Sequence, residues 1–300
     1  MNEYNNYLSN IGPEKMQNLI NRAKGVKLIA TDLDGTLFDG KHMLSDENLR
    51  ALETLAARGI VLAAATGRSR TSIPDMITSL PGIKYLITAN GAKLYLNGAD
   101  ELIFEKYLSP EALEYVRPLL SDDELMCEAF WDGTPHVEEA RYIAARNYGI
   151  PRWFSDYFFN TRKPIANFET AVFDHVNEIE NINYIFANDV VQERVRLFLA
   201  KRTDLYEFTS SFPFNYETGG VGVSKAAAVD FIAKLENISQ EETLCFGDND
   251  NDASMIEYAE IGIATANAVP LALAAADLIT LSNEESGVAA ALMALRLIGE

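Results

Sequence analysis

Two carboxylates with one residue between them follow an apolar segment near the start of the chain. They belong to the motif DLDGT, in which Asp32 and Asp34 come directly after the apolar sequence KLIAT. In an open α/β sheet, groups beyond the carboxyl ends of the strands form the ligand crevice, so both carboxylates should project into it. At close range they would repel each other, and one pKa would rise unless a cation lay between them. The motif therefore predicts an acidic, cation-binding site, with a solvated turn as the alternative.

A second acidic motif, GDNDND, follows the apolar sequence TLCF. Its three acids, Asp248, Asp250 and Asp252, are the oxygen ligands that a hard divalent cation prefers. A calcium loop of the EF-hand kind is excluded, because its sixth position would be Ala253 rather than glycine and its twelfth Ala259 rather than glutamate. The acids could instead cap the following helix, although one of them would be enough for that.

A lysine stands at the expected start of a helix, where Ser224 and Lys225 precede the sequence AAAVDFIAKL. The positive end of the helix dipole disfavours a lysine at this position unless an anion is bound there. The pair therefore points to a phosphate group. Considered alone, a lysine here is more often a solvated surface residue than a phosphate ligand.

Groups that could bind phosphoryl oxygens follow two further apolar strands. Thr66, Gly67 and Arg68 follow VLAAA and offer a hydroxyl, a small backbone turn and a guanidinium. Asn90 and Gly91 end the next strand in the same way. Each group could be ordinary turn chemistry. All of them fall at strand ends or helix starts of one predicted sheet, so we expect them to converge on one crevice.

The elements that must position these residues alternate between short apolar strands and amphipathic helices. This pattern is typical of an α/β fold with a parallel sheet. An N-cap at Ser45 and a stop at Gly59 predict a helix between the first two strands. The expected strands are residues 26–31, 60–66, 84–89, 243–246, 261–264 and 278–280. The predicted sheet is thus split into two parts of the sequence.

Between these parts the pattern changes to that of an inserted α+β module. Alternating segments flank Asn97 and Gly98, which is a strong hairpin signal. Trp131, Tyr142 and Trp153 could stack on a sugar, but buried core aromatics are the default expectation. Helices of the module are expected at residues 109–121 and 188–201. The predicted domains are an N-terminal extension (1–24), a core (25–90 and 222–300) and an inserted cap (91–221).

The charge and the targeting signals limit the partners and the location. The chain has 25 basic and 44 acidic residues, a formal net charge of −19, which would repel nucleic acids and anionic lipid surfaces. A phosphorylated substrate would therefore need local positive potential at its site. Two distant cysteines, Cys127 and Cys245, suggest no disulfide framework. No signal peptide and no apolar run of ~18 residues is visible, so a cytoplasmic protein without a membrane span is expected.

In this order and spacing, the motifs resemble those of the haloacid dehalogenase superfamily, specifically its Cof-type (subfamily IIB) phosphatases. The resemblance extends over residues 26–297 and rests on DLDGTL, ATGR, ANG, VSK and GDNDND. It implies a Rossmann-like parallel-sheet core with an inserted α+β cap. Two departures from the family pattern concern the substrate side: Ala226 replaces a usual glycine, and Thr265-Ala266-Asn267 replaces Met-Gly-Asn.

The resemblance also implies roles for individual residues. Asp32 would attack phosphorus and become an aspartyl phosphate, while Asp34 would protonate the leaving oxygen and later activate water. Mg2+ would be held by Asp32, the backbone carbonyl of Asp34 and Asp248, with Asp252 in support. The phosphoryl oxygens would be bound by Thr66 and Lys225, with Gly67, Arg68, Asn90, Gly91 and Asn251 as further candidates for phosphate or substrate contact.

These inferences predict a Mg2+-dependent phosphatase that acts on a small phosphorylated metabolite such as a sugar phosphate. A phosphosugar mutase or phosphotransferase would use the same aspartyl phosphate and is the alternative enzyme. A catalytically idle sensor of a phosphorylated ligand is the alternative from another class of protein. The oligomeric state is left open.

Overall fold

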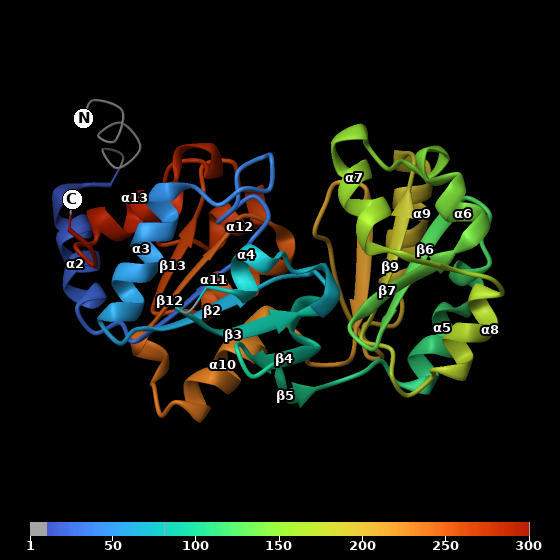
Figure 1. The fold of residues 1–300 in the computed structure, drawn as a ribbon. Coiled ribbons are helices and arrows are strands. Elements are labelled where there is room, and N and C mark those ends of the chain that lie inside the picture. Colours follow the sequence, from blue (N-terminus) through green and yellow to red (C-terminus); the bar gives the residue numbers. More distant parts are fainter. Residues whose placement is uncertain (1–10, 81, 300) are drawn as a thin grey trace.

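The chain folds around two separate β-sheets. The computed structural model describes residues 11–80 and 82–299, so the prediction for residues 1–24 lies partly outside the described residues. One sheet has eight strands and the other has six, and Figure 1 shows them as neighbouring units of one chain. The predicted class, a parallel α/β core with an inserted α+β unit, is confirmed.

The larger sheet has the strand order β14-β13-β12-β1-β2-β3-β4-β5. Pairing is parallel from β14 to β3, and the last two pairings are antiparallel. The two parts of the sequence meet where β1 pairs with β12, with Leu28 opposite Thr243 and Thr31 opposite Phe246. Its strands are β1 (Leu28–Thr31), β2 (Val61–Ala65), β3 (Ile83–Thr88), β4 (Lys93–Leu96), β5 (Glu101–Glu105), β12 (Thr243–Gly247), β13 (Ile261–Ala264) and β14 (Leu278–Ile279).

Helices cover both faces of this sheet, which explains why its strands read as continuous apolar runs. Leu52 of α3 and Leu292 of α13 pack in the cluster on one face, whereas Ile232 of α10 and Met255 of α11 pack on the other. The predicted N-cap at Ser45 is confirmed, since its side chain accepts from the amide of Asn48. The helices of this unit are α2 (Pro13–Ala23), α3 (Asp46–Ala57), α4 (Asp75–Thr78), α10 (Lys225–Leu235), α11 (Asp250–Tyr258), α12 (Pro270–Ala275) and α13 (Gly287–Ala294).

The hairpin at Asn97 and Gly98 forms as predicted, but it belongs to the larger sheet. Strand β4 pairs with β3, and β5 pairs with β4, both antiparallel. The predicted boundary at residue 90 assigns these strands to the cap, whereas the second sheet begins only with β6. The hairpin pattern reports local antiparallel pairing and carries no information on which sheet the hairpin extends.

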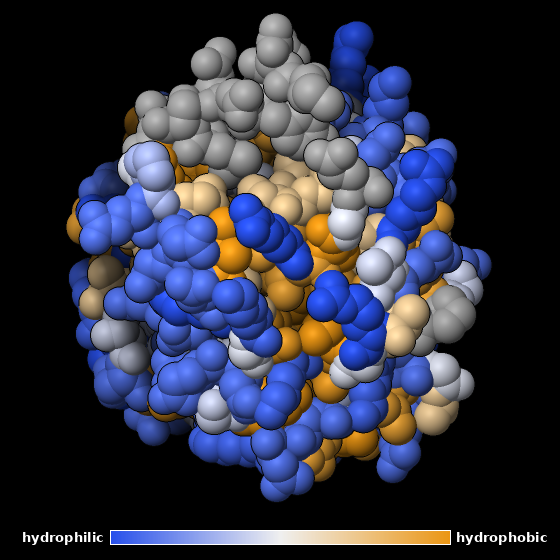
Figure 2. All heavy atoms as spheres, turned by 90° about the vertical axis from the view of Figure 1, so that its left-hand side faces the viewer, coloured by the Kyte–Doolittle hydropathy of each residue, from blue (hydrophilic) through white to orange (hydrophobic). Residues whose placement is uncertain are grey.

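Helix α2 packs on the core unit. Leu19 and Ala23 are buried in the same apolar cluster as α3 and α13, and Arg22 pairs with Glu260 at 2.6 Å between Nε and Oε1. Figure 2 views the molecule from this side and shows apolar side chains between hydrophilic ones. The described part of the predicted N-terminal extension is therefore a docked helix. Among the described residues, no helix has the length and apolarity needed to cross a membrane.

The smaller sheet, hereafter the cap sheet, has the order β10-β11-β9-β6-β7-β8 and is antiparallel except between β7 and β8. Helices α5, α8 and α9 cover one face, and α7 packs on part of the other. Its strands are β6 (Leu125–Trp131), β7 (Thr134–Glu138), β8 (Lys163–Ile165), β9 (Asn181–Phe186), β10 (Glu207–Thr209) and β11 (Asn215–Gly219). Its helices are α5 (Pro110–Leu120), α6 (Glu139–Ile143), α7 (Arg152–Thr161), α8 (Phe168–Asp174) and α9 (Asp189–Leu199).

The chain passes between the two units at two segments that touch each other. A Cβ at Gly220 would lie 2.4 Å from the carbonyl oxygen of Tyr107, so only glycine allows the two backbones to come this close. A buried ion pair joins the units beside this crossing, with 2.9 Å between Lys93 Nζ of β4 and Glu180 Oε1. We refer to this region as the paired crossing.

Candidate active site

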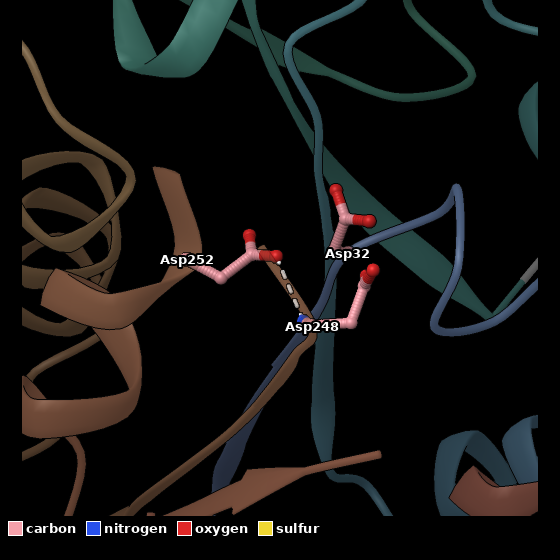
Figure 3. Close-up of side chains that lie close together, drawn as sticks. All are labelled: Asp32, Asp248 and Asp252. Carbon is pink, nitrogen blue, oxygen red and sulfur yellow. Dashed lines mark hydrogen bonds between the residues drawn. The ribbon is translucent and has the colours of Figure 1, made fainter. Parts of the chain in front are cut away.

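The two acidic motifs meet at the junction of β1 and β12. Asp32 follows β1 and Asp248 follows β12, and the parallel pairing of these strands brings both carboxylates to one edge of the sheet. Together with Asp252 of α11 they offer carboxylate oxygens that all lie within 4.8 Å of one another. Figure 3 shows the three side chains converging. The predicted convergence of these acids on one crevice is therefore observed, and a purely solvated turn is excluded because Asp32 is buried.

Lys225 lies in the middle of this acidic cluster. Its Nζ is 2.6 Å from Asp32 Oδ1 and 2.5 Å from Asp252 Oδ1, and its side chain is fully buried. Burial alone would lower the pKa of Lys225, but the two carboxylates outweigh it and raise that pKa. The alternative of a solvated surface lysine is therefore wrong. Lys225 is the first residue of its helix, so the positive end of the helix dipole disfavours its charge. The neighbouring carboxylates offset this unfavourable interaction.

Asp252 fixes the loop that carries Asp248. Its Oδ2 accepts from the backbone amides of Asp248 at 2.9 Å and Asn249 at 3.0 Å, the first of which is the dashed line in Figure 3. Asp252 thus completes a capping box with Asn249 at the start of α11, so the helix-cap alternative is correct for this one acid. Asp248 is left to face Asp32, and its Oδ1 accepts from the Thr36 hydroxyl at 2.7 Å.

Gly35 explains why the DLDGT turn can pack against the second acidic motif. Its φ is +83°, and a Cβ there would lie 2.3 Å from Asp248 Oδ2. The Gly35 carbonyl also accepts from Asn267 Nδ2 at 2.8 Å and from the Thr265 hydroxyl at 3.3 Å. Thr265, which departs from the family pattern, and Asn267, which keeps its asparagine, therefore both hold the turn of the DLDGT motif in place.

The carboxylate cluster suits a hard divalent cation. Burial, followed by the neighbouring Asp252, raises the pKa of Asp248 to about 8, and burial raises the pKa of Asp32 well above its ordinary value despite Lys225. Within the described part of the chain, four carboxylates, counting Asp34, face two Lys or Arg side chains, Lys225 and Arg68. A bound divalent cation would balance the remaining charge and favour the ionised forms, and all the offered ligands are oxygens.

Asp34 has partners of its own. Its two carboxylate oxygens each lie 2.6 Å from a guanidinium nitrogen of Arg68, and Oδ1 is 2.9 Å from His42 Nδ1. Burial opposes the ionised form, but Arg68 and then His42 outweigh it and hold the pKa of Asp34 well below its ordinary range. The contacts of Asp34 therefore favour its ionised form.

The other predicted site residues, except Gly91, line two adjoining cavities beside the carboxylate cluster. Thr66, Gly67, Arg68 and Asn251 line one cavity with Asp32 and Asp34, while Asn90 lines an adjoining one with Lys225. Asn251 Nδ2 donates to Asn90 Oδ1 at 2.9 Å. Gly91 packs against the backbone of Ser224 instead, where a Cβ would be 2.3 Å from the carbonyl oxygen.

The cap forms the opposite wall of the first cavity. This wall was missed by the sequence reasoning and consists of Phe130, Tyr157, Arg162, Asn183, Ser211, Phe212 and Glu217. A usable signal was present, since NINYIF and NYETG alternate polar residues with apolar ones in segments that become strands. The free volume of about 40 Å³ between the core and this wall is enough for a few water molecules.

The aromatic residues singled out from the sequence are not part of this wall. Trp131 is buried in the cap core and stacks on His136 with 3.6 Å between ring centroids. Trp153 is 57% exposed on α7. Tyr142 packs against Phe158. A core position, the default expectation, is correct for Trp131 and wrong for Trp153.

Comparisons with known proteins agree with this geometry. A family model described as haloacid dehalogenase-like hydrolase matches residues 29–292. The 5-amino-6-(5-phospho-D-ribitylamino)uracil phosphatase YcsE of Bacillus subtilis is 30% identical over 267 residues, which cover 89% of this chain and 94% of that protein. The phosphatase YwpJ of the same organism is 30% identical over 280 residues, covering 88% of this chain and 98% of that protein.

Solved structures show the same fold. The structure of a haloacid dehalogenase subclass IIB sugar phosphatase superimposes with a TM-score of 0.78 at 25% identity, covering 91% of this chain and 100% of that one. A haloacid dehalogenase-like hydrolase from B. subtilis gives a TM-score of 0.79 at 28% identity over the same shares. The chain therefore belongs to the haloacid dehalogenase-like hydrolases, within their Cof-type subclass IIB phosphatases.

Proposed function

We propose that this phosphatase transfers the phosphoryl group of a small phosphorylated metabolite first to Asp32 and then to water. The observation that carries the proposal is the position of the Asp32 carboxylate. It lies beside Lys225 and Asp248 at the sheet junction and lines the cavity that Thr66 and Arg68 share. A carboxylate nucleophile with cations and hydroxyl donors around it is what phosphoryl transfer needs, because most of the catalysis is positioning and charge stabilisation.

The residues present fit Mg2+ as the cofactor. We assign Asp32, Asp248 and the backbone carbonyl of Asp34 as its ligands. Asp252 remains one of the residues we assign to the metal site. Its contacts with Lys225 and with two backbone amides favour a role in holding the ligands in place rather than in binding the ion directly. When bound, the ion supplies charge neutralisation between the carboxylates and the phosphoryl oxygens.

The proposed reaction has two displacements. In the first, an Asp32 oxygen attacks phosphorus, the ester bond to the leaving oxygen breaks, and Asp34 gives that oxygen a proton. In the second, Asp34 takes a proton from water, the water oxygen attacks phosphorus, and the bond to Asp32 breaks to release phosphate. Lys225 and the Thr66 hydroxyl would bind the phosphoryl oxygens.

Asp34 must carry a proton before it can act as the acid. Its contacts with Arg68 oppose this, since they favour the anion. We propose that the substrate phosphoryl group competes for the Arg68 guanidinium, which lines the same cavity. Loss of that partner would raise the pKa of Asp34 toward the range of a proton donor.

The first test is phosphate release from a panel of phosphorylated metabolites, including sugar phosphates, with Mg2+ and with EDTA. We expect release that needs the metal and is restored when Mg2+ replaces the chelator. Release that is unaffected by EDTA would contradict the metal assignment. Phosphate that appears on an added acceptor sugar instead of in solution would identify a phosphotransferase, and no reaction with any compound would favour a sensor.

We expect Asp34→Asn to depend on the leaving group. Because the amide cannot donate a proton as the acid does, kcat/KM for alkyl esters such as glycerol 3-phosphate should fall by about 10² to 10⁴. For p-nitrophenyl phosphate, whose leaving group needs little protonation, the fall in kcat/KM should be much smaller. The ratio kcat/KM reports the first phosphoryl transfer, the step in which Asp34 is proposed to donate its proton. Equal losses for both substrates would rule out Asp34 as the acid.

A further inference from the structure

The face of the cap sheet that meets the core carries polar side chains in register across three strands. Glu128 of β6 lies opposite Asn183 of β9, and Asn183 lies opposite Glu217 of β11. All three are buried, and Asn183 and Glu217 line the cavity above Asp32. We call these residues, with the Arg162 side chain beside them, the polar row.

The cations around the cavity are already paired. Arg162 Nε is 2.7 Å from Glu128 Oε1, Arg68 is bound to Asp34, and Lys225 lies between two carboxylates. In the proposed reaction, a divalent metal, Lys225 and the Arg68 guanidinium would together serve the transferred phosphoryl group. Among the side chains lining the two cavities, no further Lys or Arg is left for a second anion.

Glu217 adds a carboxylate to this wall, and among the described residues no cation lies beside it. Burial raises its pKa, while four hydrogen-bond donors, from Ser211, Asn90, Asn215 and Asn181, oppose that rise and favour the ionised form. Its partners are neutral: it accepts from Ser211 Oγ at 2.7 Å, from Asn215 Nδ2 at 2.8 Å and from Asn90 Nδ2. In a site closed to water, an anion of the substrate near this carboxylate would be repelled much more strongly than in solution.

Two buried acceptors near this wall, one on the core side and one on the cap sheet, lack donors. Among the described residues, the buried Asn251 Oδ1 and Asn181 Oδ1 have no hydrogen-bond partner. Asn251 lines both cavities, and Asn181 Nδ2 lies 3.4 Å from Glu217 Oε2. Buried acceptors of this kind are costly unless a donor reaches them. Hydroxyl and amine groups of a ligand are such donors, whereas carboxylates and phosphates are not.

We propose, on the basis of the phosphatase function above, that the polar row selects the part of the substrate that is not phosphorylated. Glu217 is the specificity-determining residue of this selection. The preferred substrate class is phosphomonoesters whose remaining part is uncharged and rich in hydroxyl or N–H donors. Esters that carry a second anionic group are rejected.

The test compares esters that differ only in one group. Glycerol 3-phosphate is paired with 3-phosphoglycerate, and sorbitol 6-phosphate with 6-phosphogluconate, so that a CH2OH group is exchanged for a carboxylate. The wild type should favour the uncharged member of the better pair by at least about 10-fold in kcat/KM, a difference of about 1.4 kcal/mol. Glu217→Gln should reduce this ratio severalfold, mainly because kcat/KM for the ester that carries the carboxylate rises.

Two controls separate the possible outcomes. Glu193→Gln makes the same chemical change on the exposed surface of α9 and should leave the ratio unchanged. Acetyl phosphate, which has almost no part beyond the phosphoryl group, tests the proposed function itself: no hydrolysis of it or of any ester would overturn the phosphatase proposal. Hydrolysis of acetyl phosphate with equal wild-type rates for both members of each pair would overturn only the inference about the polar row, even if Glu217→Gln failed to fold.

Discussion

Asp32→Asn is expected to lower kcat by a factor of at least about 10³, because it replaces the proposed nucleophile by an amide that cannot form the aspartyl phosphate. The fold should survive, since the side chains have nearly the same volume and Lys225 keeps its contact with Asp252. Phosphate release should be measured at saturating Mg2+ with the best substrate of the panel, alongside the thermal midpoint of each protein.

The matched control is Asp250→Asn, which makes the same change in the second acidic motif. Asp250 is exposed in the first turn of α11 and lies outside the carboxylate cluster, so this variant should retain most of the wild-type rate. A folded Asp32→Asn protein with a substantial residual rate would show that phosphoryl transfer does not pass through this carboxylate.

The second large effect is expected from Lys225→Met, which should lose both activity and stability. Methionine fills similar space but leaves Asp32 and Asp252 buried without their shared cation. Removing one partner of a buried ion pair costs about 3–5 kcal/mol in the free energy of unfolding. Urea unfolding in EDTA should therefore show a midpoint well below that of the wild type.

The loss of stability in Lys225→Met should depend on pH in a defined direction. Without Lys225, the pKa of the buried Asp32 carboxylate would rise further above its value in the unfolded chain, so the folded variant binds more protons than the unfolded one. Its stability relative to the wild type should therefore recover as the pH falls from 7 toward 5. Lys234→Met, an exposed change in the same helix, is the control and should shift the midpoint little. A variant of Lys225 that is as stable as wild type at pH 7 would contradict the charge balance described for the cluster.

The core and the residues proposed to be catalytic could be predicted from the sequence because their signals are local. Each motif is a short run of polar residues after an apolar strand, and parallel pairing brings all such runs to one edge of a sheet. The positions of Asp32 and Asp248 follow from this rule, and Lys225 was expected in the same crevice because it begins a helix. Their distances and the burial of Lys225 could not be predicted, because these depend on the pairing of β1 with β12 across most of the chain.

The cap wall could not be predicted for a different reason. Asn183 and Glu217 lie on separate strands of a mixed sheet, and only the register of that sheet places them side by side. The two partners of Asp34 could not be predicted either. Arg68 and His42 come from different loops, and only the folded chain brings them to Asp34. Alternation within a strand shows which residues share a face, but it does not show what that face meets.

The paired crossing has a consequence for how the chain folds. The core sheet is complete only when β1 pairs with β12, and closing so long a loop carries an entropic cost that slows folding. The cap unit has apolar clusters of its own, and the crossing holds its two ends together at Tyr107 and Gly220. We expect a cap that forms early to shorten the effective loop. Asp32 and Asp248 would then be brought together by the pairing of two short segments of chain.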